Sequence, residues 1–559
     1  MIELRNRRIL IDGIPRLLMA GEIHYFRLQR DEWQDRIDKL KRCGCNTVAS
    51  YIPWLCHETR RRDIDLSGRI RPELDLGAFI DLCRDSGLWF IARPGPYVMA
   101  ELKNEGLPYW LFERYPELVS IGWDGRRSDY PIVDYLAPAF LEETAHWYRA
   151  VMAVIVPRLQ PHGGNVIAIQ LDNEIGMLSW LTNTPELGDA ALAGFREWLH
   201  ALGVGQAAGQ RHYLPLDDEL AFRSGVRTPD EAHAARLMQD LGRFLRWRYA
   251  RYAEALQQRA EAAGAAGVPF IINVHGSVGG RGVTFPIGIS QLRDTYAGRP
   301  GFMAGSDLYL GNLTPENFQD LYVCNAFLQA TCGPDQPLAA LEFECGDGDS
   351  GGKYGYRYAP SAADFKTRMC IAQGHRLINY YLFTGGYNYR LDPAPDDGDG
   401  RIAITGERHG IAAPVGPEGQ LNYTFPALRE TTRAMMAVAE KLAVMDEEHD
   451  AVSLGFIPDY YMTECTYTRS AVMKAIAGNV ETNRGHGPWE VMVRALLLRG
   501  YRFGAVDVQH DALSVERTPV LALPSARHMA EPVQRKLVDW ITAGGSILLY
   551  GELPLLDME

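Results

Sequence analysis

The chain of 559 residues lacks the segments that would place it in a membrane or a secretory pathway. No uncharged apolar run reaches the length needed to span a bilayer, so we expect no membrane-spanning helix. Residues 1–18 contain no apolar stretch followed by a small-residue cleavage site, which predicts the absence of a secretory signal. We therefore expect a cytoplasmic protein.

An excess of positive charge is also missing. Lys and Arg number 57 against 70 Asp and Glu, and the formal net charge is -13. No local cluster of basic residues reverses this balance, so the sequence argues against nucleic acid or an anionic membrane as a partner.

Cysteine is sparse and follows no ligand pattern. The nine cysteines are an odd number scattered over a long chain, which is typical of reduced buried thiols rather than a disulfide framework. Cys43, Cys45, Cys56 and Cys83 fit no paired CxxC spacing, so we predict no metal site. The chain has no GxxxxGK[ST] loop, and we predict no cofactor.

What the sequence does contain is typical of an ordinary globular protein. Hydrophobic residues make up 47% and aromatic residues 10% of the chain. A chain of this length exceeds what one core accommodates, so we expect a large domain and at least one smaller domain.

Eight apolar runs of strand length alternate with helical patterns over the first 440 residues or so. This rhythm predicts an α/β fold, a (β/α)8 TIM barrel over residues 1–445, while an open doubly wound sheet remains the alternative. Asp31 with Gln34 predicts a capping box before the first helix. The long helical insertion after the fourth strand has its clearest periodicity over residues 232–263. The eight predicted strands are residues 17–28, 47–54, 89–98, 166–173, 269–275, 302–309, 337–344 and 377–383.

Residues 446–559 predict a second, smaller unit. Strand-like runs alternate there with helical patterns at residues 488–498 and 531–542. This order is typical of a flavodoxin-like α/β open sheet. The unit has no GxGxxG loop after its first strand, which leaves nucleotide binding unsupported. Its predicted strands are residues 451–457, 501–508, 518–523 and 545–550.

The fourth predicted strand ends abruptly in the polar residues Asp172, Asn173 and Glu174. In parallel folds, the carboxyl ends of the strands build the active site. A single carboxylate at such a place more often begins a solvated loop. Glu342, however, ends a second apolar strand, and the fourth and seventh strands of a barrel can face each other. Such a pair suits glycoside hydrolysis, in which one carboxylic acid protonates the leaving oxygen while the other carboxylate attacks the anomeric carbon or activates water.

Aromatic and polar residues at other strand ends are candidate sugar contacts. Tyr51 and Trp54 offer ring faces that suit the C–H surfaces of a sugar, although either could fill the barrel interior. His24, His275 and Asp307 also fall at strand ends, where each is equally suited to support a neighbouring residue.

Four motifs resemble glycoside hydrolase family 35, the β-galactosidase family. They are GEIHYFR at residues 21–27, NTVASYIPW at 46–54, RPGPY at 93–97 and QLDNE at 170–174. The resemblance covers roughly residues 1–440. It implies a retaining mechanism in which Glu174 is the acid/base and Glu342 the nucleophile. It also implies sugar contacts from Tyr51, Ala100, Glu101, Asn173 and Tyr381.

The sequence departs from the family pattern in two places. Glu344 stands where the family has a tyrosine two residues after the nucleophile, and residues 408–414 replace a Tyr-rich segment. Both departures leave the identity of the sugar open. The length of the region between Tyr109 and His146 and the small second domain are more similar to the archaeal exo-β-glucosaminidase branch and to family 42 β-galactosidases. The second domain serves assembly in those relatives, so we expect a homodimer or homotrimer.

We therefore expect a retaining exo-acting β-glycosidase whose partner is a β-linked oligosaccharide or glycoside. The resemblance puts Asn173 at the C2 substituent, where an amide suits a hydroxyl, and this favours a β-galactosidase. The alternative is an exo-β-D-glucosaminidase acting on chitosan oligosaccharides, because Glu101, Glu344 and Asp307 would attract a cationic sugar. The second alternative is a non-catalytic carbohydrate-binding barrel, which the presence of both Glu174 and Glu342 disfavours.

Overall fold

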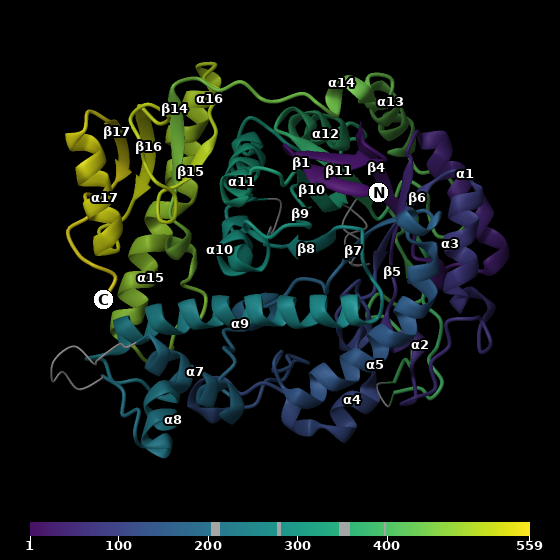
Figure 1. The fold of residues 1–559 in the computed structure, drawn as a ribbon, viewed down its shortest axis with the longest axis horizontal. Coiled ribbons are helices and arrows are strands. Elements are labelled where there is room, and N and C mark those ends of the chain that lie inside the picture. Colours follow the sequence, from purple (N-terminus) through teal and green to yellow (C-terminus); the bar gives the residue numbers. More distant parts are fainter. Residues whose placement is uncertain (203–212, 277–280, 346–357, 396–397) are drawn as a thin grey trace.

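The computed structural model describes residues 1–202, 213–276, 281–345, 358–395 and 398–559. Two parallel sheets organise the chain, and Figure 1 shows them side by side. The first is a closed barrel in which β11 pairs with β4 and completes the ring. The predicted TIM barrel is therefore confirmed, and the open doubly wound sheet is excluded for these strands. The barrel strands are β4 (Leu18–Glu22), β5 (Thr47–Tyr51), β6 (Trp89–Arg93), β7 (Val166–Gln170), β8 (Phe270–Val274), β9 (Phe302–Leu308), β10 (Leu338–Glu344) and β11 (His375–Tyr381).

The barrel strands are buried on both faces, which explains their continuous apolar sequences. Every residue in them is buried except Trp89, which is partly buried. Helices form the outer layer around the strands (Figure 1). The principal ones are α1 (Trp33–Cys43), α3 (Leu76–Asp85), α5 (Pro138–Ile155), α9 (Ala234–Ala262), α10 (Phe285–Tyr296), α11 (Phe318–Thr331), α12 (Ala362–Ala372) and α13 (Phe425–Met436).

The predicted capping box before α1 is wrong by two residues. The box is formed by Gln29 and Glu32, since the Gln29 backbone N–H donates to the Glu32 carboxylate at 2.9 Å. Gln34 instead donates to Asp38 along the exposed face of α1. The predicted pair Asp31–Gln34 and the observed pair Gln29–Glu32 have the same spacing, and the observed box caps the 3-10 turn Arg30–Glu32 that precedes α1.

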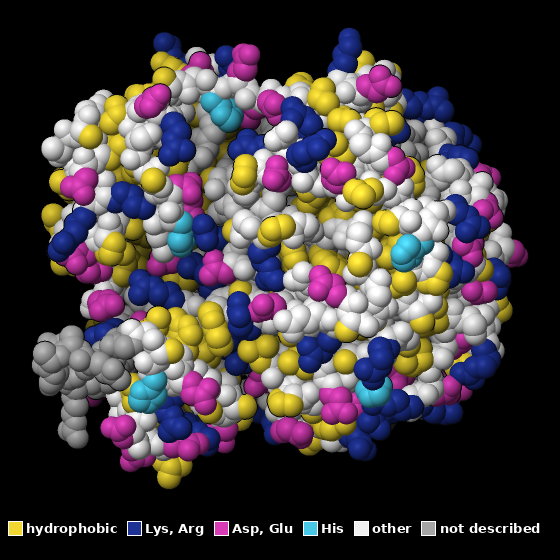
Figure 2. Space-filling model, viewed as in Figure 1, with side chains coloured by type: hydrophobic (Ala, Val, Ile, Leu, Met, Phe, Trp, Pro, Cys, Tyr) yellow, Lys and Arg dark blue, Asp and Glu magenta, His cyan; other side chains and the backbone are white. Residues whose placement is uncertain are grey.

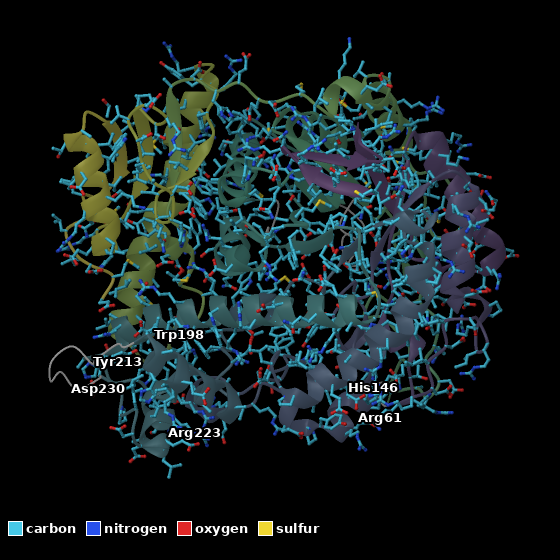
Figure 3. All side chains as sticks on the ribbon, viewed as in Figure 1. Arg61, His146, Trp198, Tyr213, Arg223 and Asp230 are labelled. Carbon is cyan, nitrogen blue, oxygen red and sulfur yellow. The ribbon has the colours of Figure 1, made fainter. Side chains whose placement is uncertain are left out.

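The insertion between β7 and β8 places a long helix across the molecule. The insertion contains α6 (Met177–Leu181), α7 (Asp189–Ala201), α8 (Glu219–Arg227) and α9. Helix α9 runs along the barrel toward the second sheet, with α7 and α8 beneath it (Figure 1). Figure 3 labels four residues around α7 and α8 at the lower left: Trp198, Tyr213, Arg223 and Asp230. Arg61 and His146 lie near each other at the lower right.

The second sheet has strand order β15-β14-β16-β17, and all of its pairs are parallel. Numbered along the chain, this order is 2-1-3-4, as in flavodoxin-like folds. The predicted α/β open sheet is therefore confirmed. Residues 445–450 contain no helix or strand, and we propose that the unit begins at residue 446. Its elements are β14 (Val452–Phe456), α15 (Ala471–Arg484), α16 (Arg494–Leu498), β15 (Ala505–Asp507), β16 (Val520–Ser525), α17 (Glu531–Thr542) and β17 (Ser546–Gly551).

Two ion pairs, one buried and one partly buried, join the barrel helices to the second unit. Arg246 on α9 lies 3.0 Å from Asp459, and Arg293 on α10 lies 3.0 Å from Asp507. Separating the two units would break both ion pairs, which therefore help to hold the second unit against α9 and α10.

All nine cysteines are free thiols, and all are buried except Cys332 and Cys465, which are partly buried. Among the described residues, no helix combines the length and the apolar character of a membrane span. No cluster of three or more potential metal ligands occurs in the described part of the chain. Acidic and basic side chains alternate over the face drawn in Figure 2.

Candidate active site

Side chains from the carboxyl ends of the barrel strands converge around Glu342 on β10. Glu342 is held by three donors: the hydroxyl groups of Tyr51 and Tyr309, and Arg93 Nη2 at 2.8 Å from Glu342 Oε1. Charge-assisted hydrogen bonds of this kind stabilise the ionised carboxylate. A carboxylate held in one orientation by buried donors is suited to act as a nucleophile.

Arg93 is itself fixed by a second carboxylate. Its Nη1 lies 2.9 Å from Glu22, and its guanidinium stacks over the Tyr51 ring at 3.7 Å. Burial alone would raise the pKa of Glu22, but Arg93, His24 and a hydrogen bond from Asn379 lower it to about 2. Glu22 is therefore ionised and forms an ion pair with Arg93 through Nη1. The other terminal nitrogen of Arg93, Nη2, donates to Glu342.

Glu174 occupies a different environment, at the turn after β7. Its backbone is left-handed, with φ 47°, and its N–H donates to Asn273 Oδ1 at 3.1 Å. No described residue donates a hydrogen bond to its carboxyl group. Burial, and then the neighbouring charges of Glu342, Glu105 and Glu101, raise the pKa of Glu174 well above its ordinary value. The raised pKa favours the protonated form of Glu174, as a general acid requires.

The raised pKa of Glu174 predicts how activity depends on pH. A proton donor works below its own pKa and fails above it, so we expect kcat/KM to fall as pH rises through the pKa of Glu174. Phenyl β-glycosides, whose leaving group needs protonation, should show this alkaline fall. Dinitrophenyl β-glycosides, which leave without a proton, should show a much shallower fall on the same enzyme. Identical alkaline limbs for both substrates would assign the limb to another group.

Asp172 and Asn173 precede Glu174 and play different parts. The Asp172 carboxylate accepts hydrogen bonds from the Tyr97 backbone N–H at 2.6 Å and from the Tyr252 hydroxyl at 2.7 Å. It therefore ties the turn after β7 to the loop after β6. Asn173 is buried, and its Oδ1 accepts from Gln170 Nε2 at 2.9 Å.

Aromatic rings form a wall beside Glu342. His24 lies 5.8 Å from Tyr51 and 5.9 Å from Tyr381 between ring centroids, and Tyr309 lies 6.2 Å from Tyr381. Burial lowers the pKa of His24 to about 4, so the imidazole is neutral. Such a wall suits the apolar C–H face of a sugar ring.

Two of the carboxylates predicted as sugar contacts do not present a free negative charge. The Glu344 carboxylate accepts from the Gly311 N–H at 2.7 Å and lies 3.5 Å from Lys366 Nζ, so its charge is matched within the protein. Asp307 accepts from Asn273 Nδ2 at 2.6 Å. Burial, and then Glu342, raise the pKa of Asp307 well above its ordinary value, so its neutral form is favoured.

Ala100 and Glu101 lie on the loop after β6, where both backbones are left-handed, with φ 56° and 53°. The Ala100 carbonyl accepts from Arg27 Nη2 at 2.6 Å. Glu101 is 36% exposed at its side chain and lies 3.3 Å from His409 Nε2. Of the three carboxylates predicted as sugar contacts, Glu101, Glu344 and Asp307, Glu101 is therefore the most exposed.

Two other predicted positions, Trp54 and His275, contact groups within the protein. Trp54 is fully buried and donates to Glu58 at 2.6 Å, which places it in the core rather than beside a sugar. His275 contacts the Ile175 carbonyl at 3.0 Å and stacks on Trp180 at 5.9 Å.

The sequence interpretation did not single out Arg93, Glu22 or Gln170 as site residues. Their signal was present, since all three are polar residues inside apolar strand sequences. A buried arginine or glutamate needs a charged partner, so Arg93 and Glu22 could have been recognised as candidates, although the sequence does not say which groups they contact.

Two family models match this chain, one within the barrel and one within the second unit. Residues 8–199 match the family described as glycosyl hydrolases family 35, and residues 468–559 match a GLMA-like second domain. The first match includes Glu174 but ends before β10, so it does not reach Glu342.

Two curated proteins align over nearly the whole chain. A β-1,2-glucosyltransferase of Ignavibacterium album is 26% identical over 98% of this chain and 75% of its own length. An exo-β-D-glucosaminidase of Thermococcus kodakarensis is 25% identical over 100% of this chain and 68% of its own length.

Among solved structures, a β-galactosidase from the haloarchaeon Halorubrum lacusprofundi is similar at a TM-score of 0.67 and 16% identity. The similarity covers 95% of this chain and 72% of that protein. At this level of identity it shows a shared fold.

Proposed function

We propose, from the premise that this chain is a glycoside hydrolase resembling family 35, that it is a retaining exo-acting β-glycosidase. The observation that supports this most is the contrast between the two carboxyl groups. Glu342 is surrounded by donors that stabilise its anion, whereas burial and neighbouring charges favour the protonated form of Glu174. A carboxylate held by three donors and a carboxyl group whose protonated form is favoured match the two roles of a glycosidase.

The proposed reaction proceeds in two steps. Glu342 attacks the anomeric carbon and forms a glycosyl ester while Glu174 gives its proton to the leaving oxygen. Glu174, now ionised, takes a proton from water, which attacks the same carbon and releases Glu342. Each step inverts the configuration, so the product keeps the β configuration of the substrate.

For the sugar, we propose a β-galactoside. Asn173, which the family resemblance puts at C2, suits a hydroxyl group. Two of the three carboxylates that could attract a cationic sugar are poorly suited to do so. Glu344 forms an ion pair with Lys366, and the raised pKa of Asp307 favours its neutral form. The exo-β-D-glucosaminidase alternative is kept because of the relative with that name and because of the accessible Glu101.

A panel of nitrophenyl glycosides tests this choice. We expect kcat/KM for the β-galactoside to exceed that for the β-glucosaminide by about tenfold or more, the value of one well-placed hydrogen bond to a polar substituent. Asn173→Asp should narrow or invert this gap, because a carboxylate prefers the ammonium group. The ratio of β-galactoside to β-glucoside should not change, since these two sugars share the same group at C2. Wild-type enzyme that degrades chitosan oligomers from the non-reducing end and ignores β-galactosides would contradict the proposal.

The glucosyltransferase relative suggests a second fate for the intermediate. In a retaining mechanism, a sugar hydroxyl can replace water as the group that attacks the glycosyl ester. A β-glucoside donor with added glucose would then yield a disaccharide rather than free sugar. Analysis of products at increasing glucose concentrations distinguishes the two activities.

We also propose a homodimer or homotrimer built through the second unit. Strand β17 is an edge strand, and nearby apolar side chains are exposed, with Val538 at 60%, Leu548 at 48% and Ile541 at 42%. Exposed apolar side chains beside a sheet edge are typical of a surface that another subunit covers. Light scattering at micromolar concentration should give a dimer or trimer mass, and Val538→Asp should shift it toward the monomer. A monomeric mass for the wild-type protein would refute the proposal.

A further inference from the structure

A buried chain of hydrogen bonds runs from Arg93 through Gln170 to Asn173. Arg93 Nε donates to Gln170 Oε1 at 2.7 Å. Gln170 Nε2 donates to Asn173 Oδ1 at 2.9 Å and to the Asp172 carbonyl at 2.7 Å. Arg93, Gln170 and Asn173 are each at most 1% exposed. These hydrogen bonds therefore connect the Arg93 guanidinium, which contacts Glu342, to the side chain of Asn173, which precedes Glu174.

The donors and acceptors at its two ends fix the direction of this series of hydrogen bonds. A guanidinium has donors only, so the atom of Gln170 that faces Arg93 must be the carbonyl oxygen. The Gln170 NH2 group then faces away from Arg93, where the Asp172 carbonyl can only accept. Asn173 must consequently turn its own oxygen toward Gln170. Its Nδ2 group lies on the other side, 3.5 Å from the Val98 carbonyl.

We infer that Gln170 is a positioning residue that decides which end of the Asn173 amide meets the C2 substituent of the sugar. This inference rests on the proposed function, which puts Asn173 at C2. With Oδ1 engaged by Gln170, Asn173 offers the sugar an N–H donor. A hydroxyl oxygen accepts from that donor, whereas an ammonium group has no lone pair with which to accept. Gln170 thus selects a 2-hydroxy sugar over a 2-amino sugar without touching either.

Two variants of Gln170 test the inference. Gln170→Met removes the donor that orients Asn173, and Gln170→Glu replaces it with an acceptor that attracts the Asn173 NH2 group. For each variant, kcat/KM is measured on nitrophenyl β-galactoside, β-glucosaminide and the 2-deoxy galactoside, which has no group at C2. We expect the preference for galactoside over glucosaminide to fall by about tenfold in Gln170→Met and further in Gln170→Glu. The advantage of galactoside over its 2-deoxy analogue should shrink in parallel.

Two controls separate orientation from general damage. Gln336 is also a buried glutamine that donates to backbone carbonyls, those of Tyr296 and Phe302 at 2.8 Å, but Phe302 begins β9 at the opposite end of the barrel. Gln336→Met should leave the substrate ratios unchanged even if it lowers stability. In the Asn173→Asp background, where the two oxygens are equivalent, adding Gln170→Met should change the ratios no further. The double variant thus detects action through the Asn173 amide.

The outcomes distinguish this inference from the proposed function. A wild-type enzyme that prefers the galactoside, with ratios that fall in both Gln170 variants, supports both. If the wild type prefers the galactoside but folded Gln170 variants keep its ratios, the inference is overturned and the proposed function stands. The inference is also overturned if Gln170→Met changes the ratios equally in the Asn173→Asp background. A wild type that prefers the glucosaminide overturns the proposed function and the inference together.

Discussion

Replacing Glu342 with glycine is expected to lower turnover of an aryl β-galactoside by about ten-thousand-fold or more, the scale of losing a covalent nucleophile. The substitution leaves a space among the donors Tyr51, Arg93 and Tyr309, all of which bind the Glu342 carboxylate. Azide is a small anion that fits such a space and attacks the anomeric carbon in place of Glu342. Turnover should therefore recover with azide, and NMR should identify a glycosyl azide of inverted α configuration.

Glu344→Gly is the matched control for this experiment. Glu344 lies two residues away on the same strand, but its carboxylate is bound by Gly311 and Lys366 instead of the donors around Glu342. We expect a smaller loss of activity and no recovery with azide. Recovery in Glu344→Gly but not in Glu342→Gly would move the nucleophile to the other glutamate.

Glu174→Ala should produce a loss that depends on the leaving group. Removing a general acid costs about 100- to 10,000-fold when the leaving oxygen needs a proton, so phenyl glycosides and disaccharides should be poor substrates. Formation of the glycosyl enzyme from a dinitrophenyl glycoside should be nearly unaffected. The intermediate then lacks its base, so azide should accelerate its breakdown and give a β-glycosyl azide of retained configuration.

Glu105→Gln provides the control for Glu174. Glu105 is a partly buried carboxyl group whose charge helps to raise the pKa of Glu174, and desolvation raises its own pKa to about 7. Its replacement should move the alkaline limb of activity to lower pH while the dependence on leaving group stays that of the wild type. Equal losses on phenyl and dinitrophenyl substrates in Glu174→Ala would argue that Glu174 is not the proton donor.

The arrangement of strands was predictable from the sequence because burial leaves a local signature. All eight barrel strands fall within the predicted ranges or start within two residues of them, since a strand covered on both faces reads as a continuous apolar run. The polar residues that end such runs must collect at one end of a parallel barrel. This is why Glu174 and Glu342 were predictable as candidates, although their roles remain proposals.

The contacts among these residues were not predictable, because they depend on how distant strands align. The link from Glu22 to Arg93 and on to Glu342 joins three strands of the barrel. Lys366, which forms the ion pair with Glu344, lies on α12. Trp54 illustrates the same limit, since its position at a strand end does not tell whether the ring turns toward the mouth or into the core.

The central claim, that Glu342 is the nucleophile of a retaining β-glycosidase, is tested most directly by trapping the glycosyl enzyme. A dinitrophenyl 2-deoxy-2-fluoro-β-galactoside forms the ester readily and slows its hydrolysis, so the intermediate accumulates. Mass spectrometry of the digested protein should find one fluorogalactosyl group per chain, attached to Glu342. A label on any other carboxylate, such as Glu174, Glu101 or Asp307, would contradict the claim.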